Sequence, residues 1–435
     1  MSSIGHIIKS ERLNQSMKQI TLAKGICSPS YLSKIENNTT VPSEEVITLL
    51  LNRLNIVIDQ VSSEEENKVV ASLFKLYKIG VLKRDKNLIR ESLHKITNRK
   101  IHFLQQNNYY SYHLYMFRLL LILNEEETNL LPSYSIIVKL EDKFVNKQRF
   151  VANLNLGLYY YLKDENYKAL CKLEVSLKLV NHLIFDEWEL ADFYNVLSHS
   201  YFKCNEFYNA IDYASKSLKF YKDNLLFERA IDNYIVIGAA HKNLRKYDEA
   251  EKNYHLAKKL AIDFKLFSYE GVIYQNLGSL YAIQGRHEKA IDFYKNSLIK
   301  KVEHCNSEGC LLTILSIIKE YSKQCNHEHV LSWCKEGLEK MEEVRSQCKY
   351  ERTSYFFHFE IYRALHSFDE KLENVLKSAI NHFEIIQDDR HVQKYSILLA
   401  NHCFKEHKLK ASCLYYQKSI QILLKQKYIN QWEDL

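Results

Sequence analysis

Four alanines recur at a nearly constant interval in this chain of 435 residues: Ala169, Ala210, Ala250 and Ala290 lie 41, 40 and 40 residues apart. Each has a small residue twelve positions before it, a ring nine positions before it and another small residue seven positions after it. In that order, these neighbours are Gly157, Ser198, Gly238 and Gly278, then Tyr160, Tyr201, His241 and Tyr281, then Ser176, Ser217, Ala257 and Ser297. Small residues allow two helices to approach closely, and a ring fills the space beside them.

This period predicts an all-α fold of stacked tetratricopeptide repeats, each a pair of helices. Repeats begin near residues 150, 191, 231 and 271, and weaker copies near 311, 352 and 392. Two earlier pairs are indicated by helical periodicity at 67–82 with 85–98 and at 108–123 with 133–146. About nine pairs would form a right-handed superhelix, whose concave face is the surface that such proteins use for binding.

Composition supports this reading and predicts a cytoplasmic protein. The chain has only 10 glycines and 3 prolines, so tight-turned strands are disfavoured, while 46% hydrophobic and 26% charged residues are globular values. It has no apolar run long enough to span a bilayer, and the start of the chain, residues 1–13, is polar and charged rather than signal-like. The ten cysteines form no Cys-x-x-Cys pair, which favours free thiols. We expect no membrane association.

Residues 4–58 lie outside the period and are typical of a helix-turn-helix. A helix ends near Lys24, Gly25 turns the chain, Ser28 caps the next helix, and Pro29 takes the first helical position. The core expected for this domain consists of Ile20, Ala23, Ile26, Leu32, Ile35, Val46, Leu49, Leu50 and Leu54. We therefore predict a DNA-binding domain at 1–61, a linker at 62–66 that includes the acidic run Glu64 to Glu66, and a sensor and dimerisation domain at 67–435.

The segment from Ser28 to Asn37, Ser-Pro-Ser-Tyr-Leu-Ser-Lys-Ile-Glu-Asn, resembles the recognition segment of Xre/Cro helix-turn-helix domains, as does the later Pro42-Ser43. The resemblance implies that Arg12 and Glu36 form a structural, partly buried ion pair. It also implies DNA contacts, through base edges or the backbone, for Gln19, Pro29, Ser30, Tyr31 and Lys34. Pro29 replaces a longer polar residue, so its contact would be apolar, for instance with a thymine methyl group.

An Xre/Cro-type domain followed by repeats of about 40 residues resembles the RNPP family of peptide-responsive regulators, the group of Rap, NprR, PlcR and PrgX. The layout is most similar to NprR or to an enlarged PlcR-like protein. The resemblance implies a homodimeric transcription regulator that binds double-stranded DNA at a palindromic operator. It also implies that a short signalling peptide, as used in quorum sensing, binds the concave face of the repeats.

The repeat itself indicates which residues would line such a groove. Positions 2, 5, 9 and 12 of each first helix face inward, and polar side chains there can bracket the backbone of an extended peptide. The predicted peptide-binding residues are Asp192, Asn195, His199, Lys242, Gln275, Ser279 and Lys319. Tyr160, Tyr201, Tyr281 and Tyr321, in contrast, occupy the packing position of the repeat and are expected in the core.

Other readings of the sequence stay open. The Rap branch lacks a DNA-binding domain, so a scaffold that binds or dephosphorylates a signalling protein is one alternative, with the helix-turn-helix serving as a protein-interaction module. A regulator that senses redox state or a small molecule is another, because cysteines and histidines gather at Cys305, Cys310, Cys325, His327, His329 and Cys334. Their spacing matches no four-ligand zinc pattern. No catalytic motif is present, so we expect neither an enzyme, a metal nor a cofactor.

Overall fold

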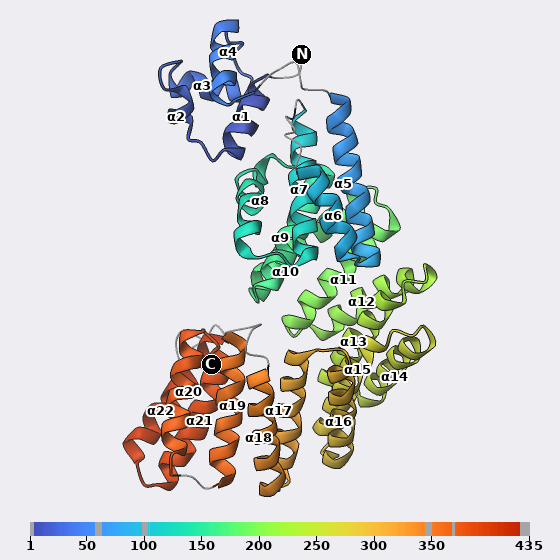
Figure 1. The fold of residues 1–435 in the computed structure, drawn as a ribbon, viewed down its shortest axis with the longest axis vertical. Helices are drawn as coiled ribbons and strands as arrows, with labels where there is room; N and C mark the ends of the chain where they lie inside the picture. The colour runs from blue at the N-terminus through green and yellow to red at the C-terminus, as the bar shows by residue number, and fades with distance from the viewer. Residues whose placement is uncertain are drawn as a thin grey trace. The chain divides into compact units, whose positions relative to one another are not determined.

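The N-terminal part of the computed structural model consists of four short helices (Figure 1). The structure describes residues 4–56, 63–97, 103, 105–343, 350–367 and 370–426. The four helices are α1 (Ile4–Asn14), α2 (Gln19–Ala23), α3 (Pro29–Glu36) and α4 (Glu44–Arg53). The turn between α2 and α3 depends on Gly25, whose φ of +74° is accessible to glycine at no steric cost. Ser28 caps α3 as expected, since its hydroxyl oxygen accepts a hydrogen bond from the Tyr31 amide at 3.1 Å.

The core of this domain follows the prediction at most positions but not at all of them. Ala23, Leu32, Ile35, Leu50 and Leu54 are buried, as expected. Ile26 and Val46 are partly buried against them. The predictions for Ile20 and Leu49 were wrong, because these side chains are 68% and 44% exposed. Successive helical residues are turned by about 100°, so Ile20 lies opposite the buried Leu22, and Leu49 lies outside the buried arc of α4.

Close approach of α1 to α3 requires a glycine. A Cβ atom on Gly5 would lie 1.8 Å from the backbone oxygen of Ile35, which is backbone that cannot move aside like a side chain. The start of α1 is thus packed directly on the end of α3, the helix expected to read DNA.

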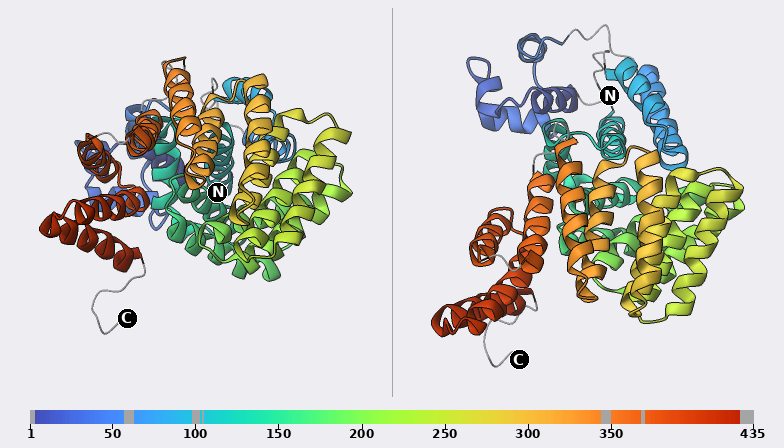
Figure 2. Two further views of the ribbon diagram at one scale, coloured as in Figure 1. Left: turned by 90° about the horizontal axis from the view of Figure 1, so that it is seen from below. Right: turned by 60° about the horizontal axis from the view of Figure 1, so that its bottom comes forward.

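The rest of the described chain forms helices that follow one another in pairs (Figure 2). The first two pairs are α5 (Ser63–Lys83) with α6 (Lys86–Thr97) and α7 (Gln106–Leu123) with α8 (Glu127–Lys139). The repeats follow as α9 (Asn146–Leu162) and α10 (Asn166–Leu179), α11 (Glu187–Lys203) and α12 (Phe207–Asp223), α13 (Phe227–Asn243) and α14 (Tyr247–Asp263), α15 (Glu270–Ile283) and α16 (His287–Glu303), α17 (Ser307–Lys323) and α18 (His327–Glu343), α19 (Tyr350–Ser367) and α20 (Leu372–Ile385), and α21 (Asp389–Lys405) and α22 (Leu409–Gln426). The all-α prediction and the predicted order of pairs are confirmed.

The prediction that the acidic run Glu64 to Glu66 belongs to a linker was wrong, because these residues form the first turn of α5. Acidic side chains are favoured there because the N-terminal end of a helix carries a partial positive charge. Glu66 has a further role, since its buried carboxylate accepts hydrogen bonds from the Gln105 amide and from Asn108 Nδ2, both at 3.1 Å.

The small residues of the period are buried where the helices meet. Ala169, Ala210, Ala250 and Ala290 have no exposed surface. A Cβ atom on Gly157 would lie 2.6 Å from Leu173 Cγ, so a larger residue cannot fit without displacing the neighbouring helix. The period therefore marks helix contacts.

The rings of the repeat pack as the period predicts. Tyr201, Tyr281 and Tyr321 are buried in the core. Tyr160 is half-buried, packs against the core and shares a hydrogen bond with the Tyr134 hydroxyl at 3.1 Å.

The chain divides into two compact units, residues 1–245 and 246–435. The first contains α1 to α13, and the second contains α14 to α22. No helix in the described ranges is both long and apolar enough to cross a membrane.

Candidate functional site

The exposed residues of α3 are those that the sequence assigns to DNA. Pro29 occupies the first turn of α3, and Ser30 and Lys34 lie one turn apart on its solvent-facing surface. Tyr31 is half-buried against the core of the domain. Pro29, Ser30 and Lys34 are therefore available to a partner, whereas Tyr31 also holds α3 in place.

A buried ion pair fixes α3 to α1. Arg12 Nε donates to Glu36 Oε1 at 2.6 Å and Arg12 Nη2 donates to Glu36 Oε2 at 2.8 Å, in bidentate geometry. Arg12 Nη1 also donates to the Met17 carbonyl at 3.0 Å. The structural ion pair expected from the sequence is confirmed. Gln19 Nε2 donates to the same carboxylate at 2.7 Å, so the amide nitrogen of this predicted DNA contact is held by Glu36.

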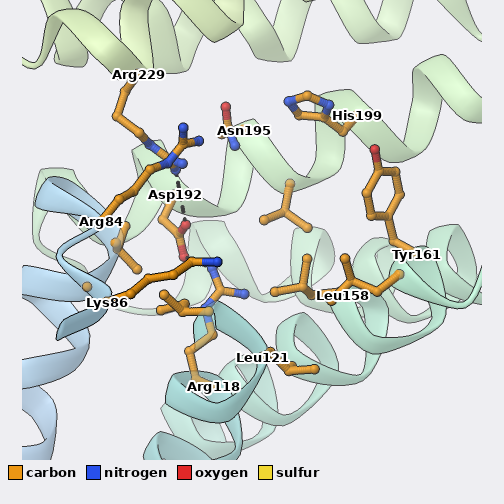
Figure 3. A pocket seen from close by; sticks show the side chains of 15 residues that line it. Arg84, Lys86, Arg118, Leu121, Leu158, Tyr161, Asp192, Asn195, His199 and Arg229 are labelled. Atoms are coloured by element: carbon orange, nitrogen blue, oxygen red, sulfur yellow. Dashed lines mark hydrogen bonds and ion pairs between the residues drawn. The ribbon is translucent and has the colours of Figure 1, made fainter. Parts of the chain in front are cut away.

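The first unit contains a cavity of about 410 Å³ among its helical pairs (Figure 3). Asp192, Asn195 and His199 line it from α11, so the structure brings three of the predicted peptide-binding residues together. The other lining residues are Gly80, Val81, Arg84 and Lys86 from the first pair and its turn, Arg118, Leu121 and Ile122 from α7, Leu158, Tyr161 and Leu162 from α9, Val196 from α11, and Arg229 from α13. The cavity thus combines apolar walls with a small group of charges, as ligand sites do.

Asp192 is the centre of those charges. Its Oδ2 atom accepts from Arg118 Nη2 at 2.5 Å and from the Tyr77 hydroxyl at 3.2 Å, and its Oδ1 atom lies 3.6 Å from Arg229 Nη2. The side chains of Asp192, Arg118 and Arg229 are 2%, 3% and 8% exposed, so water screens this group little. Nearby, Arg84 pairs with Asp232 of α13 at 2.6 Å.

Asn195 and His199 continue the same wall of α11. Asn195 Oδ1 accepts from Asn233 Nδ2 at 3.1 Å, which links α11 to α13. Burial lowers the pKa of His199 to about 4, an effect that Arg229 and Arg84 reinforce and Asp232 opposes. The imidazole is therefore neutral at pH 7, and its ring lies edge-on to that of Tyr161.

The remaining predicted peptide-binding residues do not line this cavity. Lys242 is half-buried on α13, where burial lowers its pKa. Gln275, Ser279 and Lys319 belong to the second unit. There Gln275 Nε2 donates to Ser316 Oγ at 3.0 Å and Gln275 Oε1 accepts from Thr313 at 2.7 Å. These four assignments stay predictions.

Gln275 also accepts a hydrogen bond from Lys301 Nζ at 3.1 Å. Ser279 hydrogen-bonds to Tyr294, and burial together with the charges of Lys394 and Arg390 lowers the pKa of Lys319 to about 8.

Sequence reasoning missed the four cations of the cavity: Arg84, Lys86, Arg118 and Arg229. Only Arg118 could have been recognised from the sequence. Arg118 is the only charged residue in the apolar run 116–123, and it is 2% exposed. A charge buried in such a helix needs a partner.

The cysteines and histidines between Cys305 and Cys334 do not share one environment in the structure. Cys310 and Cys334 are buried, and burial raises the pKa of both thiols, that of Cys334 to about 12. Cys305 and Cys325 are exposed, while His327 Nδ1 lies 2.9 Å from His366 Nδ1. Within the described part of the chain, no three metal-ligating side chains are placed to hold an ion. The buried thiols are poor candidates for redox sensing, because the reactive form is the thiolate.

Known proteins resemble this chain in both its N-terminal helix-turn-helix domain and its helical repeats. A helix-turn-helix family model matches residues 8–60. The transcriptional activator NprA of Geobacillus stearothermophilus is 29% identical over 412 residues, which cover 92% of this chain and 98% of that protein. The apo quorum sensor NprR from B. thuringiensis has the same fold, with a TM-score of 0.65 at 16% identity over 83% of this chain and 99% of NprR. A Rap protein solved in complex with Competence and Sporulation Factor gives 0.62 at 17% identity over 85% of this chain and 100% of its own.

The fold and the cavity define a class of proteins in which a helix-turn-helix domain precedes a superhelix of tetratricopeptide repeats. Within that class, this chain is similar over nearly its whole length to the transcriptional activator NprA, and it shares the fold of NprR and of a Rap protein.

The neutral imidazole of His199 gives the protein a predictable response to acid. Its pKa is about 4 in the folded protein against 6.5 for the exposed group, so the unfolded chain binds a proton that the folded protein does not. Stability contributed in this way is complete above pH 6.5 and is lost as the pH falls from 6.5 to 4. We expect His199→Gln to make the fall in the free energy of unfolding shallower over that range, as measured by urea denaturation. His182→Gln, which alters an exposed histidine, serves as control; equal slopes in all three proteins would contradict the prediction.

Proposed function

We propose that this protein is a cytoplasmic DNA-binding transcription regulator controlled by a short signalling peptide that binds the concave face of its repeats. The observation that carries the proposal is the pairing, in one chain, of a capped and exposed recognition helix with a partly apolar cavity inside the repeats. The relatives point in the same direction: one is a transcriptional activator, another is a quorum sensor, and a third was solved in complex with Competence and Sporulation Factor.

DNA binding is supported by the exposure and chemistry of α3. Recognition helices of this type place their N-terminal residues at the base edges of the major groove. Ser30 can donate to or accept from a base, and Lys34 can bind a guanine or a phosphate. The bidentate Arg12–Glu36 pair and the capping hydroxyl of Ser28 hold the helix rigidly for this purpose.

Replacing both Ser30 and Lys34 by alanine should abolish sequence-specific DNA binding, because base contacts of this kind each contribute on the order of 1–3 kcal/mol of discrimination. The measurement is selection from a random-sequence duplex library, in which the wild-type protein should enrich one palindromic motif and the double variant none. Lys75→Ala removes the same charge from an exposed position on α5 and should leave the motif unchanged. Enrichment of the same motif by the double variant would reject α3 as the reading helix.

Peptide binding is supported by the side chains that meet in the cavity. Asn195 carries both a donor and an acceptor and can therefore pair with a peptide backbone. Leu121, Leu158 and Val196 supply apolar wall for a side chain. Such a ligand acts on DNA binding if it favours one conformation of the repeats over another.

Asn195→Ala should weaken peptide binding by about twofold to tenfold, since it removes a net hydrogen bond of about 0.5–1.5 kcal/mol. We would measure this with a labelled library of short synthetic peptides, first selecting binders on the wild-type protein and then titrating them against each variant. Asn209→Ala, an exposed amide on α12, is the control and should bind as the wild type does. Unchanged affinity in Asn195→Ala would exclude this residue from the site.

We also propose a homodimer that pairs through α22, which would suit a palindromic operator. The buried side of α22 includes Ser412 and Ser419. Next to that side runs a stripe of exposed residues spaced by four and three positions in turn: Leu409, Cys413, Tyr416, Ile420 and Leu423. This alternation is the spacing of a coiled-coil seam, and a second copy of the same stripe is self-complementary about a twofold axis.

Ile420→Glu should convert the dimer to a monomer, because it places a charge in the middle of the apolar seam. Gln417→Glu introduces the same charge at an exposed position outside the stripe and should leave the dimer intact. Light scattering after size-exclusion chromatography reports the mass of each protein. A dimer that persists in Ile420→Glu would place the interface elsewhere.

A catalytic role is not part of this proposal. The titratable groups of the cavity are engaged or neutral, since Asp192 is bound by two arginines and burial holds the pKa of His199 at about 4. His199 is therefore not poised to exchange protons near pH 7.

A further inference from the structure

The cavity carries an excess of positive charge. Arg84, Lys86, Arg118 and Arg229 line it, while the carboxylates beside them are those of Asp192 and Asp232. Four cations against two carboxylates leave two positive charges uncompensated within this group. His199 adds no charge at neutral pH, because burial and the arginines lower its pKa to about 4.

Two of these arginines have donors that nothing in the described structure uses. Arg118 gives one hydrogen bond to Asp192 through Nη2, while its Nε and Nη1 atoms are buried with no hydrogen-bond partner. Arg229 donates through Nη2 to the Tyr221 hydroxyl at 3.0 Å, and its Nε atom is likewise buried and unpartnered. The two residues are 2% and 7% exposed overall, so water reaches them little. A buried donor without an acceptor is costly, and native proteins contain few of them.

The arrangement suits an acceptor that brings negative charge. Figure 3 shows Arg118 and Arg229 reaching from α7 and α13 toward Asp192 of α11, with Lys86 on the same side of the cavity. A guanidinium group presents paired N–H donors that match the two oxygens of a carboxylate. The neighbouring Leu121, Leu158 and Val196 exclude water, which strengthens such a contact.

We propose that this cavity selects peptides by a carboxylate, either an acidic side chain or the C-terminal group, which accepts hydrogen bonds from Arg118 with Arg229 and Lys86 beside it. Asp192 then acts as the residue that orients the two guanidinium groups rather than as a contact for a basic ligand. This inference rests on the proposed peptide-binding function and names the class of peptide that the site takes.

The test uses three pools of short synthetic peptides titrated against the full-length protein. The first pool has amidated C-termini and no acidic residue, the second is amidated and has one Asp or Glu, and the third has no acidic residue but a free C-terminal carboxylate. A pool with the right carboxylate should bind about tenfold to a hundredfold more tightly than the neutral pool, the range expected for a hydrogen bond to a charged group. Comparing the second and third pools identifies which carboxylate the cavity takes.

Three variants test whether residues of the cavity cause the preference for peptides that carry a carboxylate. Arg118→Met should abolish it, and Lys86→Gln should reduce it. Lys86 is exposed and its replacement leaves no buried charge unpaired, so this variant keeps the test decisive if Arg118→Met does not fold. Arg90→Met removes an arginine of α6 outside the cavity and should keep the full preference.

Two outcomes would overturn the inference, and they can be told apart. If the neutral pool binds as tightly as both carboxylate pools, or if the preference survives in Arg118→Met and Lys86→Gln, peptide binding stands and the carboxylate selection is wrong. If no pool binds, the proposed peptide-binding function fails, and the inference fails with it.

Discussion

The close approach of paired helices at small residues is the constraint on which the rest of this structure depends. Ala169, Ala210, Ala250 and Ala290 are completely buried, and the hydroxyl groups of Ser176 and Ser297 donate to backbone carbonyls of the preceding helix at 2.9 and 2.6 Å. Because packing uses the same positions in every repeat, those positions cannot vary to suit a ligand. The inward-facing positions of the first helices are free of this requirement, and Asp192, Asn195 and His199 of the cavity occupy such positions.

Much of the fold could be predicted because packing and turn rules are local. The period fixed the helical pairs, and Gly25, Ser28 and Pro29 marked the turn between α2 and α3 through their own backbone preferences. The wrong predictions arose where a residue was assigned from its chemical type alone, without regard to its position on a helix. Ile20 and Leu49 are apolar but lie off the buried arc of their helices, and the acidic run Glu64 to Glu66 was read as an interruption although acidic residues favour a helix start.

The candidate site could be predicted only in part, for a physical reason. Asp192, Asn195 and His199 follow from their places on one helix of a well-formed repeat. Arg84 and Arg118 come from the first two helical pairs, which lie before the four clear copies of the sequence period, so no pattern indicated the orientation of their side chains. Arg229 meets Asp192 only through the stacking of consecutive repeats. A site formed by four or more helices depends on tertiary geometry that repeat positions alone do not supply.

The charges around Asp192 connect this site to the shape of the first unit. Burying an aspartate with two arginines contributes little net stability compared with apolar packing, so stability alone does not explain its presence. What the group does is link helices that are far apart in sequence: Tyr77 of α5 donates to Asp192 of α11, Arg118 joins from α7, and Arg84, in the turn after α5, pairs with Asp232 of α13. A carboxylate that binds Arg118 beside Arg229 accepts from donors that Asp192 leaves unused, and so adds to these links. Any difference in its affinity between two spacings of α7, α11 and α13 therefore shifts the population toward one of them, which is the physical requirement for a ligand to control a distant domain.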